Sequence, residues 1–559
     1  MALHKFSVIQ ILKIFSRKER LIFTAAFLVF TLSSIFAAIN FFEKKTVFRP
    51  VAGGEYIEGV IGQPSFINPV IAGDKEADRD LIELVFSELS DLAESFKMSE
   101  DGKIWNVRLK ENIFWQDNKP IVSDDVVFTI KAIQDPDSRS PLSLSWRGIL
   151  AERVSEIELK LTLSEPYAFF ENSIKELRPI PQHLFENIPT ANLRLSGYSL
   201  EPIGSGPFKF AFFEKEHSGF IREYRLAASE NYFGQKPYLK NLSFKYYQNE
   251  DELIKAFNDK LIDGFGGLSP KNLSRINVNH RVFGLRSPKY YAVFLNSISQ
   301  PAFKDKNIRL ALDYATDKKT LVKKIFNGRA LLNSGPLVLG MKGFAPQLYS
   351  EENYSLEKAN FVLEAGGWQL NNEGIREKKE NKEAEARRLE FNLIVPQISF
   401  LVETANLIRE DWLKIGVKLN LTIRPLAEIN EEVIKTRNYE MIIFGNFFAN
   451  VDNPDLSSFW HSSERFYPGL NLSLYENKAV DILIESIRRD LNEKNCLTDL
   501  ISLQSLIIND LPAIFLYSPN YLYVANLSLN GFNDKIISFP SDRFKNVESW
   551  YVKRARVFR

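Results

Sequence analysis

The residues that could carry out acid–base or nucleophilic chemistry are scattered along this chain of 559 residues. Its five histidines stand at positions 4, 183, 217, 280 and 461, and none lies in an HExxH pattern or a triad-like context. The single cysteine, Cys496, lies in a charged stretch with no histidine close to it in the sequence. We therefore expect neither an enzyme nor a resident metal or cofactor. His461, beside Trp460, is the one histidine whose position near a binding strand deserves testing.

A glycine-rich loop at Gly204-Ser205-Gly206-Pro207 raises the possibility of phosphate binding. A phosphate-cradling loop needs free backbone amides and is normally followed by a Lys-Ser/Thr pair. Here no such pair follows, and Pro207 removes an amide. The loop therefore predicts a tight backbone path, not a nucleotide site.

Residues 92–133 show the elements that must position any site. Ser99 to Gly102 form a turn, because Asp and Gly tolerate the required backbone angles. Trp105, Val107 and Leu109 then alternate with polar residues, which predicts a half-buried strand. Ser123 is placed as the N-cap of a helix that continues to residue 133.

Residues 21–39 are uncharged and apolar, near the length that crosses a bilayer. Lys13, Arg17, Lys18 and Arg20 precede this run closely, and the positive-inside rule places residues 1–20 in the cytoplasm. We expect a single-pass signal-anchor over residues 21–42, a linker over 43–52, and a body outside the cell membrane. A cleaved signal peptide remains the alternative, because Ala37 and Ala38 are small. No cysteine follows the run, which excludes a lipoprotein anchor.

The charge distribution excludes one class of partner. The whole chain carries a net charge of +1, but eight basic and two acidic residues fall among the first 50. The remainder is mildly acidic, so we expect no nucleic-acid binding. One cysteine permits no intramolecular disulfide.

Several segments, in order along the chain, resemble the bacterial extracellular solute-binding proteins of family 5, the receptors of peptide-type ABC importers. They are 62–69 (GQPSFINP), 92–133, 204–208 (GSGPF), 231–239 (NYFGQKPYL), 303–312 (FKDKNIRLAL) and 510–517 (DLPAIFLY). Each motif alone is weak, and their shared order makes the resemblance specific. The resemblance implies an α/β, two-lobed periplasmic-binding-protein-like fold (type II, three domains) with mixed sheets.

The same resemblance divides the exported body. Residues 53–90, 198–285 and 510–559 correspond to lobe I, residues 91–197 to a small domain II, and residues 286–509 to lobe II. Domain II is expected to be shortened, because a hairpin that the family usually inserts before Leu92 has no counterpart here.

The family lines its cleft with a strand and turn that fall at residues 441–463. Peptide-binding members commonly grip the ligand's amino terminus with an acidic residue, and Asn450 stands at that place. Asp452 lies on the same side of an extended chain, and we hypothesise that it takes part of this role. The alternative is that Asp452 caps the turn before Pro454. The full set of predicted ligand-binding residues is Asp74, Asn296, Asn446, Phe447, Phe448, Asn450, Asp452 and Trp460.

The resemblance thus implies a membrane-tethered receptor that binds extended peptides and delivers them to ABC permease subunits. The first alternative keeps the fold and changes the ligand to a metal chelate, haem or sugar. The second is a membrane-anchored peptide sensor without transport. An exported hydrolase is disfavoured, because no nucleophile–base pair is visible in the sequence.

Overall fold

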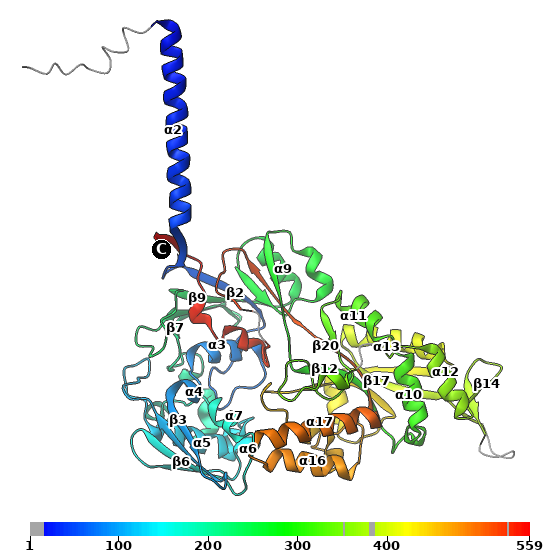
Figure 1. Cartoon of the computed structure of the whole chain (residues 1–559). Coiled ribbons are helices and arrows are strands. Elements are labelled where there is room, and N and C mark those ends of the chain that lie inside the picture. Colours follow the sequence, from blue (N-terminus) through cyan, green and yellow to red (C-terminus); the bar gives the residue numbers. More distant parts are fainter. Residues whose placement is uncertain (1–15, 350–352, 380–385, 534–535, 559) are drawn as a thin grey trace, which may run out of the picture.

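The computed structural model describes residues 16–349, 353–379, 386–533 and 536–558. A long helix, α2 (Arg17–Lys45), projects from a two-lobed body (Figure 1). Ser16 caps this helix: its hydroxyl accepts from the Glu19 amide, and the Glu19 carboxylate accepts from the Ser16 amide. No residue of α2 is buried in protein, and its composition is apolar enough to cross a membrane.

The segment that follows α2 is a strand, so the predicted linker over residues 43–52 is wrong. The helix runs through Lys45, and β1 (Thr46–Pro50) begins at the next residue. β1 pairs antiparallel with β22 (Arg554–Phe558), the C-terminal strand, in a sheet of two strands. Backbone pairing between the two ends of the chain is not visible in local sequence.

Lobe I is built on a seven-stranded mixed sheet with the order β11-β21-β10-β2-β9-β8-β7. In that order the strands are His280–Leu285, Tyr521–Asn526, Gly264–Gly266, Glu55–Ile61, Asn241–Tyr247, Ile221–Ala228 and Phe208–Lys215. Helices α3 (Glu76–Val85) and α9 (Glu250–Asn258) pack against it. Three segments far apart in the sequence therefore share one sheet.

Domain II carries a four-stranded sheet of order β3-β4-β6-β5, with bounds Ala93–Met98, Ile104–Leu109, Glu158–Thr162 and Leu150–Arg153. Its helices are α4 (Leu89–Leu92), α5 (Ser123–Gln134), α6 (Ser143–Trp146), α7 (Phe170–Lys175) and α8 (Gln182–Phe185). The alternating burial of β4 confirms the predicted half-buried strand. Only α4 separates α3 from β3, as the missing hairpin predicts.

One local prediction in domain II is wrong. Ser123 is the first helical residue of α5 and is buried, and Val122 occupies the N-cap position. The Ser123 hydroxyl donates to the Ser155 carbonyl, while Asp125 accepts from the Val122 amide at 3.0 Å. Val122 has no side chain that can accept from the first turn, and the one bond at this helix start that involves a carboxylate is from the Val122 amide to Asp125, the third helical residue.

Lobe II contains a six-stranded sheet of order β13-β20-β12-β19-β17-β18. The strands are Ala330–Leu332, Ala513–Pro519, Lys289–Leu295, Met441–Phe447, Glu390–Pro396 and Lys418–Arg424. Its helices are α10 (Lys306–Ala315), α11 (Lys318–Phe326), α12 (Leu356–Ala365), α13 (Ser399–Leu413), α14 (Leu426–Glu428), α15 (Ser457–Trp460), α16 (Lys478–Arg489) and α17 (Glu493–Asp510). A small sheet of β14 (Gln369–Leu370), β15 (Arg376–Lys378) and β16 (Arg387–Arg388) extends the lobe.

The predicted boundary at residue 510 needs a correction. β20 pairs with β12 and β13 inside lobe II, so lobe I resumes only at β21. The two lobes are joined by two short connections, residues 286–288 between β11 and β12, and Asn520 between β20 and β21. Two adjacent extended connections of this kind permit rotation of one lobe against the other about few dihedral angles.

Candidate functional site between the lobes

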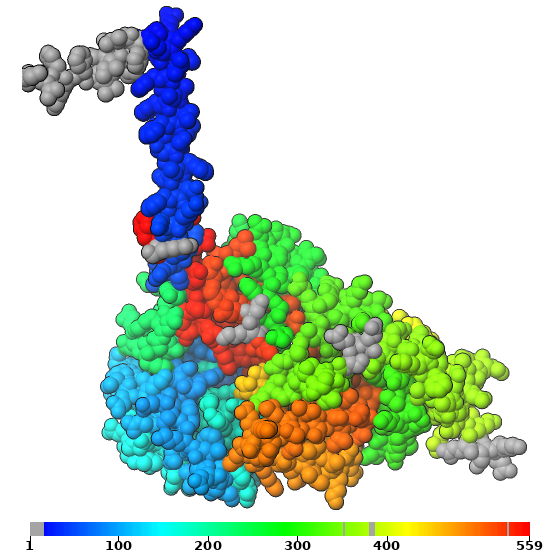
Figure 2. Space-filling model, in the orientation of Figure 1, coloured from blue at the N-terminus to red at the C-terminus, as the bar shows by residue number. Residues whose placement is uncertain are grey.

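The lobes meet where β19 leaves the sheet of lobe II. Phe447 and the chain after it face two segments of the other half: residues 167–178 of domain II, and Phe539, which directly precedes the short helix η9 (Pro540–Phe544) of lobe I. Phe169 of domain II even joins a hydrophobic cluster composed otherwise of lobe II residues. In Figure 2 the cyan surface of domain II touches the orange surface of α16 and α17.

A chain of four side chains crosses between the lobes. The ring of Phe447, in lobe II, packs edge-on against Phe539 with centroids 5.1 Å apart. The guanidinium of Arg79 lies 3.8 Å over the same Phe539 ring and pairs with Asp74 at 2.9 Å. The predicted residues Asp74 and Phe447 are therefore brought to one interface through two residues that sequence reasoning missed. The Asp74 side chain is 94 % exposed, so its carboxylate faces solvent beside Arg79.

Asn450 contacts the opposite half directly. Its amide Nδ2 donates to the Glu176 carboxylate of domain II, and its Oδ1 accepts from the Asp452 amide at 2.6 Å. Asn172 Nδ2 donates to the Asp452 carbonyl at 3.4 Å. The loop after β19 is thus held across the interface by domain II.

The turn before Pro454 is capped by asparagines, not by Asp452. Asn450 accepts from the Asp452 amide, and Asn453 Oδ1 accepts from the Asp455 amide at 3.3 Å. Within the described part of the chain no group donates to the Asp452 carboxylate, which is exposed. The capping alternative for Asp452 is therefore wrong, and its carboxylate is left available for another partner.

Glu176, the C-cap residue of α7, belongs to a charged group at this interface. Arg178 pairs with Glu83 at 2.6 Å and with Glu88 at 2.8 Å, and Lys545 lies 3.5 Å from Glu88. Asp542 lies 3.4 Å from Lys545. Four carboxylates here face two cations, so the interface carries excess negative charge when all are ionised.

Removal of water by the surrounding protein raises the pKa of Glu83 and of Glu176 to about 7, against the attraction of Arg178 and Lys545 respectively. The side chain of Glu176 is nonetheless accessible to water. Glu176 therefore lies at the accessible edge of the contact between domain II and the loop after β19. Near pH 7 its charge responds to small changes in its surroundings.

Four predicted ligand residues lie in the core of lobe II instead. Asn296 is fully buried, and its Nδ2 donates to the carbonyls of Tyr439 at 2.8 Å and Arg437 at 3.2 Å. Asn446 Nδ2 donates to the Tyr290 hydroxyl at 2.7 Å. Phe448 and Trp460 belong to a hydrophobic cluster. These side chains fix β19 and its loop, and the structure does not bring them to the interface surface.

A polar pocket of about 450 Å³ lies between domain II and lobe II. Tyr167 Oη donates to Asp455 at 3.1 Å, and Arg488 lies over the Tyr167 ring while its Nε is 3.2 Å from Asp455. His461 lines this pocket, 3.5 Å from Glu485. Among the residues described, no group of three or more His, Cys, Asp or Glu is placed to hold a metal ion.

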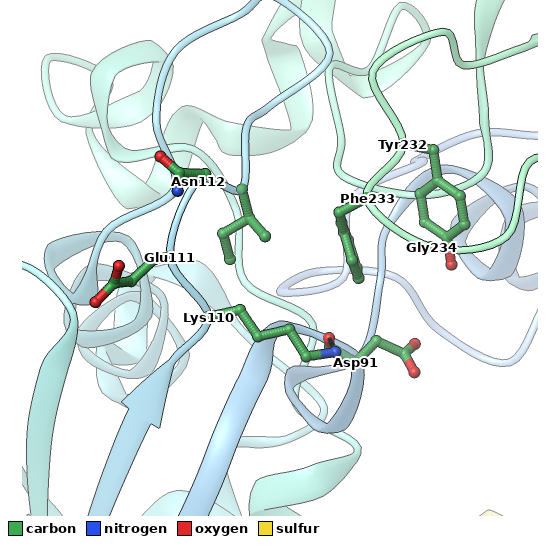
Figure 3. Close-up of a pocket in the computed structure, with 8 residues that line it drawn as sticks. Asp91, Lys110, Glu111, Asn112, Tyr232, Phe233 and Gly234 are labelled. Atoms are coloured by element: carbon green, nitrogen blue, oxygen red, sulfur yellow. Dashed lines mark hydrogen bonds between the residues drawn. The ribbon is translucent and has the colours of Figure 1, made fainter.

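A second pocket, of about 410 Å³, lies within the other half of the molecule. Figure 3 shows Lys110 reaching toward Asp91 and facing the Phe233 ring; its Nζ donates to the Asp91 carbonyl at 2.6 Å. All eight lining residues come from domain II, its boundary with lobe I, and the 232–234 loop of lobe I. This pocket is therefore separate from the contact between the lobes.

Two α/β lobes joined by two short connections, with a polar interface between them, define a two-lobed solute-binding receptor. The chain belongs to the bacterial extracellular solute-binding proteins, family 5, whose middle-region profile matches residues 89–467. The family and the fold predicted from sequence are confirmed.

Similar proteins cover nearly the whole chain. The oligopeptide-binding protein AppA of Bacillus subtilis is 25 % identical over 532 residues, 91 % of this chain and 94 % of AppA. The structure of AppA with a nonapeptide matches with a TM-score of 0.68 at 24 % identity, over 90 % of this chain and 100 % of the chain in that structure. The structure of CtaP from Listeria monocytogenes has a TM-score of 0.75 at 24 % identity and covers 89 % of this chain and 99 % of its own. The structure of NikZ from Campylobacter jejuni with Ni(L-His) has a TM-score of 0.69 at 24 % identity, with the same coverage of 89 % and 99 %.

Sequence reasoning missed Glu176, Arg79 and Phe539. Each lies on a segment that local patterns describe only as helix or loop. The nearest signal was the PIPQH segment that begins at Pro179, since Glu176 stands three residues before it.

Proposed function

We propose that this chain is the membrane-anchored receptor of an ABC importer and that it binds an extended peptide between its two lobes. The observation that carries the proposal is that Phe447 meets Phe539, and the loop after β19 meets Glu176, at one interface. AppA, which matches this chain along nearly its whole length, is seen with a nonapeptide. Permease subunits of the importer are the expected partners.

The recognition mode follows from the geometry. β19 ends at Phe447. Beyond it, the Phe448 amide and the carbonyls of Val451 and Asp452 have partners within the chain, so in this proposal the backbone amides of residues 449–451 pair with a peptide main chain. Backbone pairing tolerates many side chains. Rotation about the two connections at residues 286–288 and Asn520 closes the lobes over the ligand.

The ligand's ammonium group is placed next to Glu176 and Asp452 in this proposal. Asn450 supplies no charge, but its side-chain amide donates to the Glu176 carboxylate. In this proposal Glu176 is thereby held where the ligand's ammonium group requires an acidic partner. An incoming ammonium displaces this amide and gains an ionised partner. Asp452, whose carboxylate has no partner among the described residues, provides the second acceptor.

Helix α2 is the anchor in this proposal. Its 29 residues carry no contact that buries them in the body, and basic residues flank the apolar run at both ends. Intact-mass measurement of the protein from isolated membranes tests this directly: a retained helix gives the full-length mass, and a cleaved leader gives a mass that lacks it.

The experiment that tests peptide binding is mass spectrometry of molecules that co-purify with the full chain in detergent, released by mild denaturation. A ladder of short peptides, unchanged after incubation with the protein, supports a receptor that does not hydrolyse its ligand. A nickel chelate such as that seen with NikZ, or haem or a sugar, would move the ligand class to the alternative. Peptides that shorten with time would contradict the receptor assignment.

A further inference from the structure

The two-stranded sheet of β1 and β22, here called the terminal ribbon, is set apart from the body. Its register runs from Thr46 opposite Phe558 to Pro50 opposite Arg554. Every residue of β22 is exposed, and within the described part of the chain each of the two strands pairs with no strand besides the other. A two-stranded ribbon is marginally stable in water, so a further surface is needed to support it.

The ribbon lies at the foot of α2, beside the C-terminus (Figure 1). The apolar run of residues 21–39 is about 29 Å long at 1.5 Å per residue, which matches the hydrocarbon thickness of a bilayer. Residues 40–45 then extend the helix by about 9 Å, through the headgroup layer. Because β1 begins at Thr46 without a linker, the ribbon starts at the outer membrane–water boundary.

The ribbon and the last residues of α2 carry strong positive charge. Residues 43–50 and 553–558 together contain one acidic residue, Glu43, and six cations: Lys44, Lys45, Arg49, Lys553, Arg554 and Arg556. Glu43 is paired with Arg556 at 3.8 Å. Anionic headgroups attract each such cation by about 1 kcal/mol near the surface.

Aromatic side chains are interleaved with these cations. Arg554 and Arg556 lie 4.5 and 4.7 Å from the centre of the Phe48 ring, and Phe42 packs edge-on against Phe558 at 5.9 Å. Phe48 is nevertheless 52 % exposed and Phe558 65 % exposed. Apolar aromatic side chains interleaved with basic ones favour the boundary between headgroups and acyl chains.

We propose that the terminal ribbon binds anionic phospholipid headgroups of the outer leaflet and so fixes the orientation of lobe I on the membrane. The proposal rests on the retention of α2 as an anchor. Only residues 51–54 separate β1 from β2 of lobe I, a span of at most about 14 Å. Lobe I is therefore held at the membrane while lobe II remains free to rotate.

The test uses the full chain in nanodiscs made of phosphatidylcholine alone or with phosphatidylglycerol. V557C carries an environment-sensitive fluorophore on the ribbon; the native Cys496 is buried and remains unlabelled under native conditions. The two fluorescence lifetimes report ribbon in contact with lipid and ribbon in water. The lipid-contacting fraction should rise with phosphatidylglycerol and fall with added salt.

Variants that remove positive charge from the ribbon test the contribution of its cations. R554Q/R556Q should lower the ratio of contacting to free ribbon by about 30-fold, the effect of two cations. Because these arginines pack on Phe48, K44Q/K45Q is the second variant, with a similar loss expected. K323Q/K324Q removes two exposed cations from α11 and should leave the ratio unchanged.

The ribbon proposal is overturned if the lifetimes do not respond to lipid charge, to salt or to either ribbon variant while the protein still floats with the nanodiscs. That result leaves the anchor intact. Protein that lacks α2 by mass overturns both. A signal that changes only when permease subunits are added assigns the ribbon to a protein partner and overturns the lipid assignment.

Discussion

Replacement of Glu176 by Gln is the most direct probe of the interface. The substitution keeps an oxygen that accepts from Asn450 Nδ2 and removes the negative charge. If this carboxylate receives the peptide's ammonium, the variant loses one charge-assisted hydrogen bond, worth about 1.5–3 kcal/mol. Because the Glu176 side chain remains accessible to water, the lower end applies, and the dissociation constant should rise about 10-fold.

The pH dependence of affinity tests the same residue independently. Desolvation raises the pKa of Glu176 to about 7 in the ligand-free protein, so the ionised fraction of this carboxyl increases as the pH rises through that value. Affinity for a peptide with a free amino terminus should therefore increase from about pH 6 to about pH 7.5. It should fall again above about pH 8, where the α-amino group loses its proton. In E176Q only the upper fall should remain.

Isothermal titration calorimetry with a co-purifying peptide and its N-acetylated form measures both effects. The acetylated peptide should bind wild type and E176Q alike, because it lacks the ammonium. The matched control is E171Q on the same helix, where Glu171 pairs with Lys175 at 2.6 Å on the protein surface. Equal affinities and equal pH profiles for wild type and E176Q would refute the reasoning.

Three further predictions concern the lobes and their stability. Phe447→Ala removes the ring contact with Phe539, worth about 0.5–1.5 kcal/mol, and should shift the lobes toward an open arrangement in small-angle scattering. Arg543→Met leaves the fully buried Glu58 and Asp80 without their cation and should reduce the unfolding free energy by about 3–5 kcal/mol in denaturant titration. Glu83→Gln should remove a loss of stability that wild type shows between about pH 4.5 and 7. Burial raises the folded-state pKa of Glu83 to about 7, so the folded state binds more protons than the unfolded chain in that window. The free energy of unfolding of wild type should therefore fall by up to about 3 kcal/mol as the pH rises from about 4.5 to 7.

The outcomes that would contradict these predictions are specific. Unchanged scattering for the Phe447 variant would show that the ring contact does not bias closure. A change for R543M as small as that for R222M, at an exposed surface arginine, would show that the buried acids find other partners. A stability–pH slope in E83Q equal to that of wild type would assign the slope to other carboxylates.

Local sequence was sufficient for elements whose signals are short-range. The alternation of Trp105, Val107 and Leu109 predicts β4 because one sheet face is buried, and the structure confirms it. Family motifs in a fixed order predict the two-lobed fold. The helix cap at α5 was misplaced by one residue, because a serine and a nearby aspartate both satisfy the same local pattern.

The site was predicted less well, because it is assembled from segments far apart in the chain. Of the predicted residues, the structure brings Phe447, at the end of β19, and Asn450 and Asp452, in the loop after it, to the interface between the lobes. It also selected Asn296 and Trp460, whose polar or aromatic character is equally suited to a core position. Glu176 could not be found, since its pairing with Asn450 joins residues 274 positions apart.

The sequence by itself determined that this chain has an apolar N-terminal helix, an α/β body of the solute-binding family, and no local catalytic motif. These follow from composition, periodicity and ordered motifs, which act over a few residues. Tertiary structure alone decided that β20 belongs to lobe II, that β1 pairs with β22, and that Glu176 meets Asn450. Each of these depends on which distant backbone or side-chain groups satisfy one another, and that choice is made only when the whole chain packs.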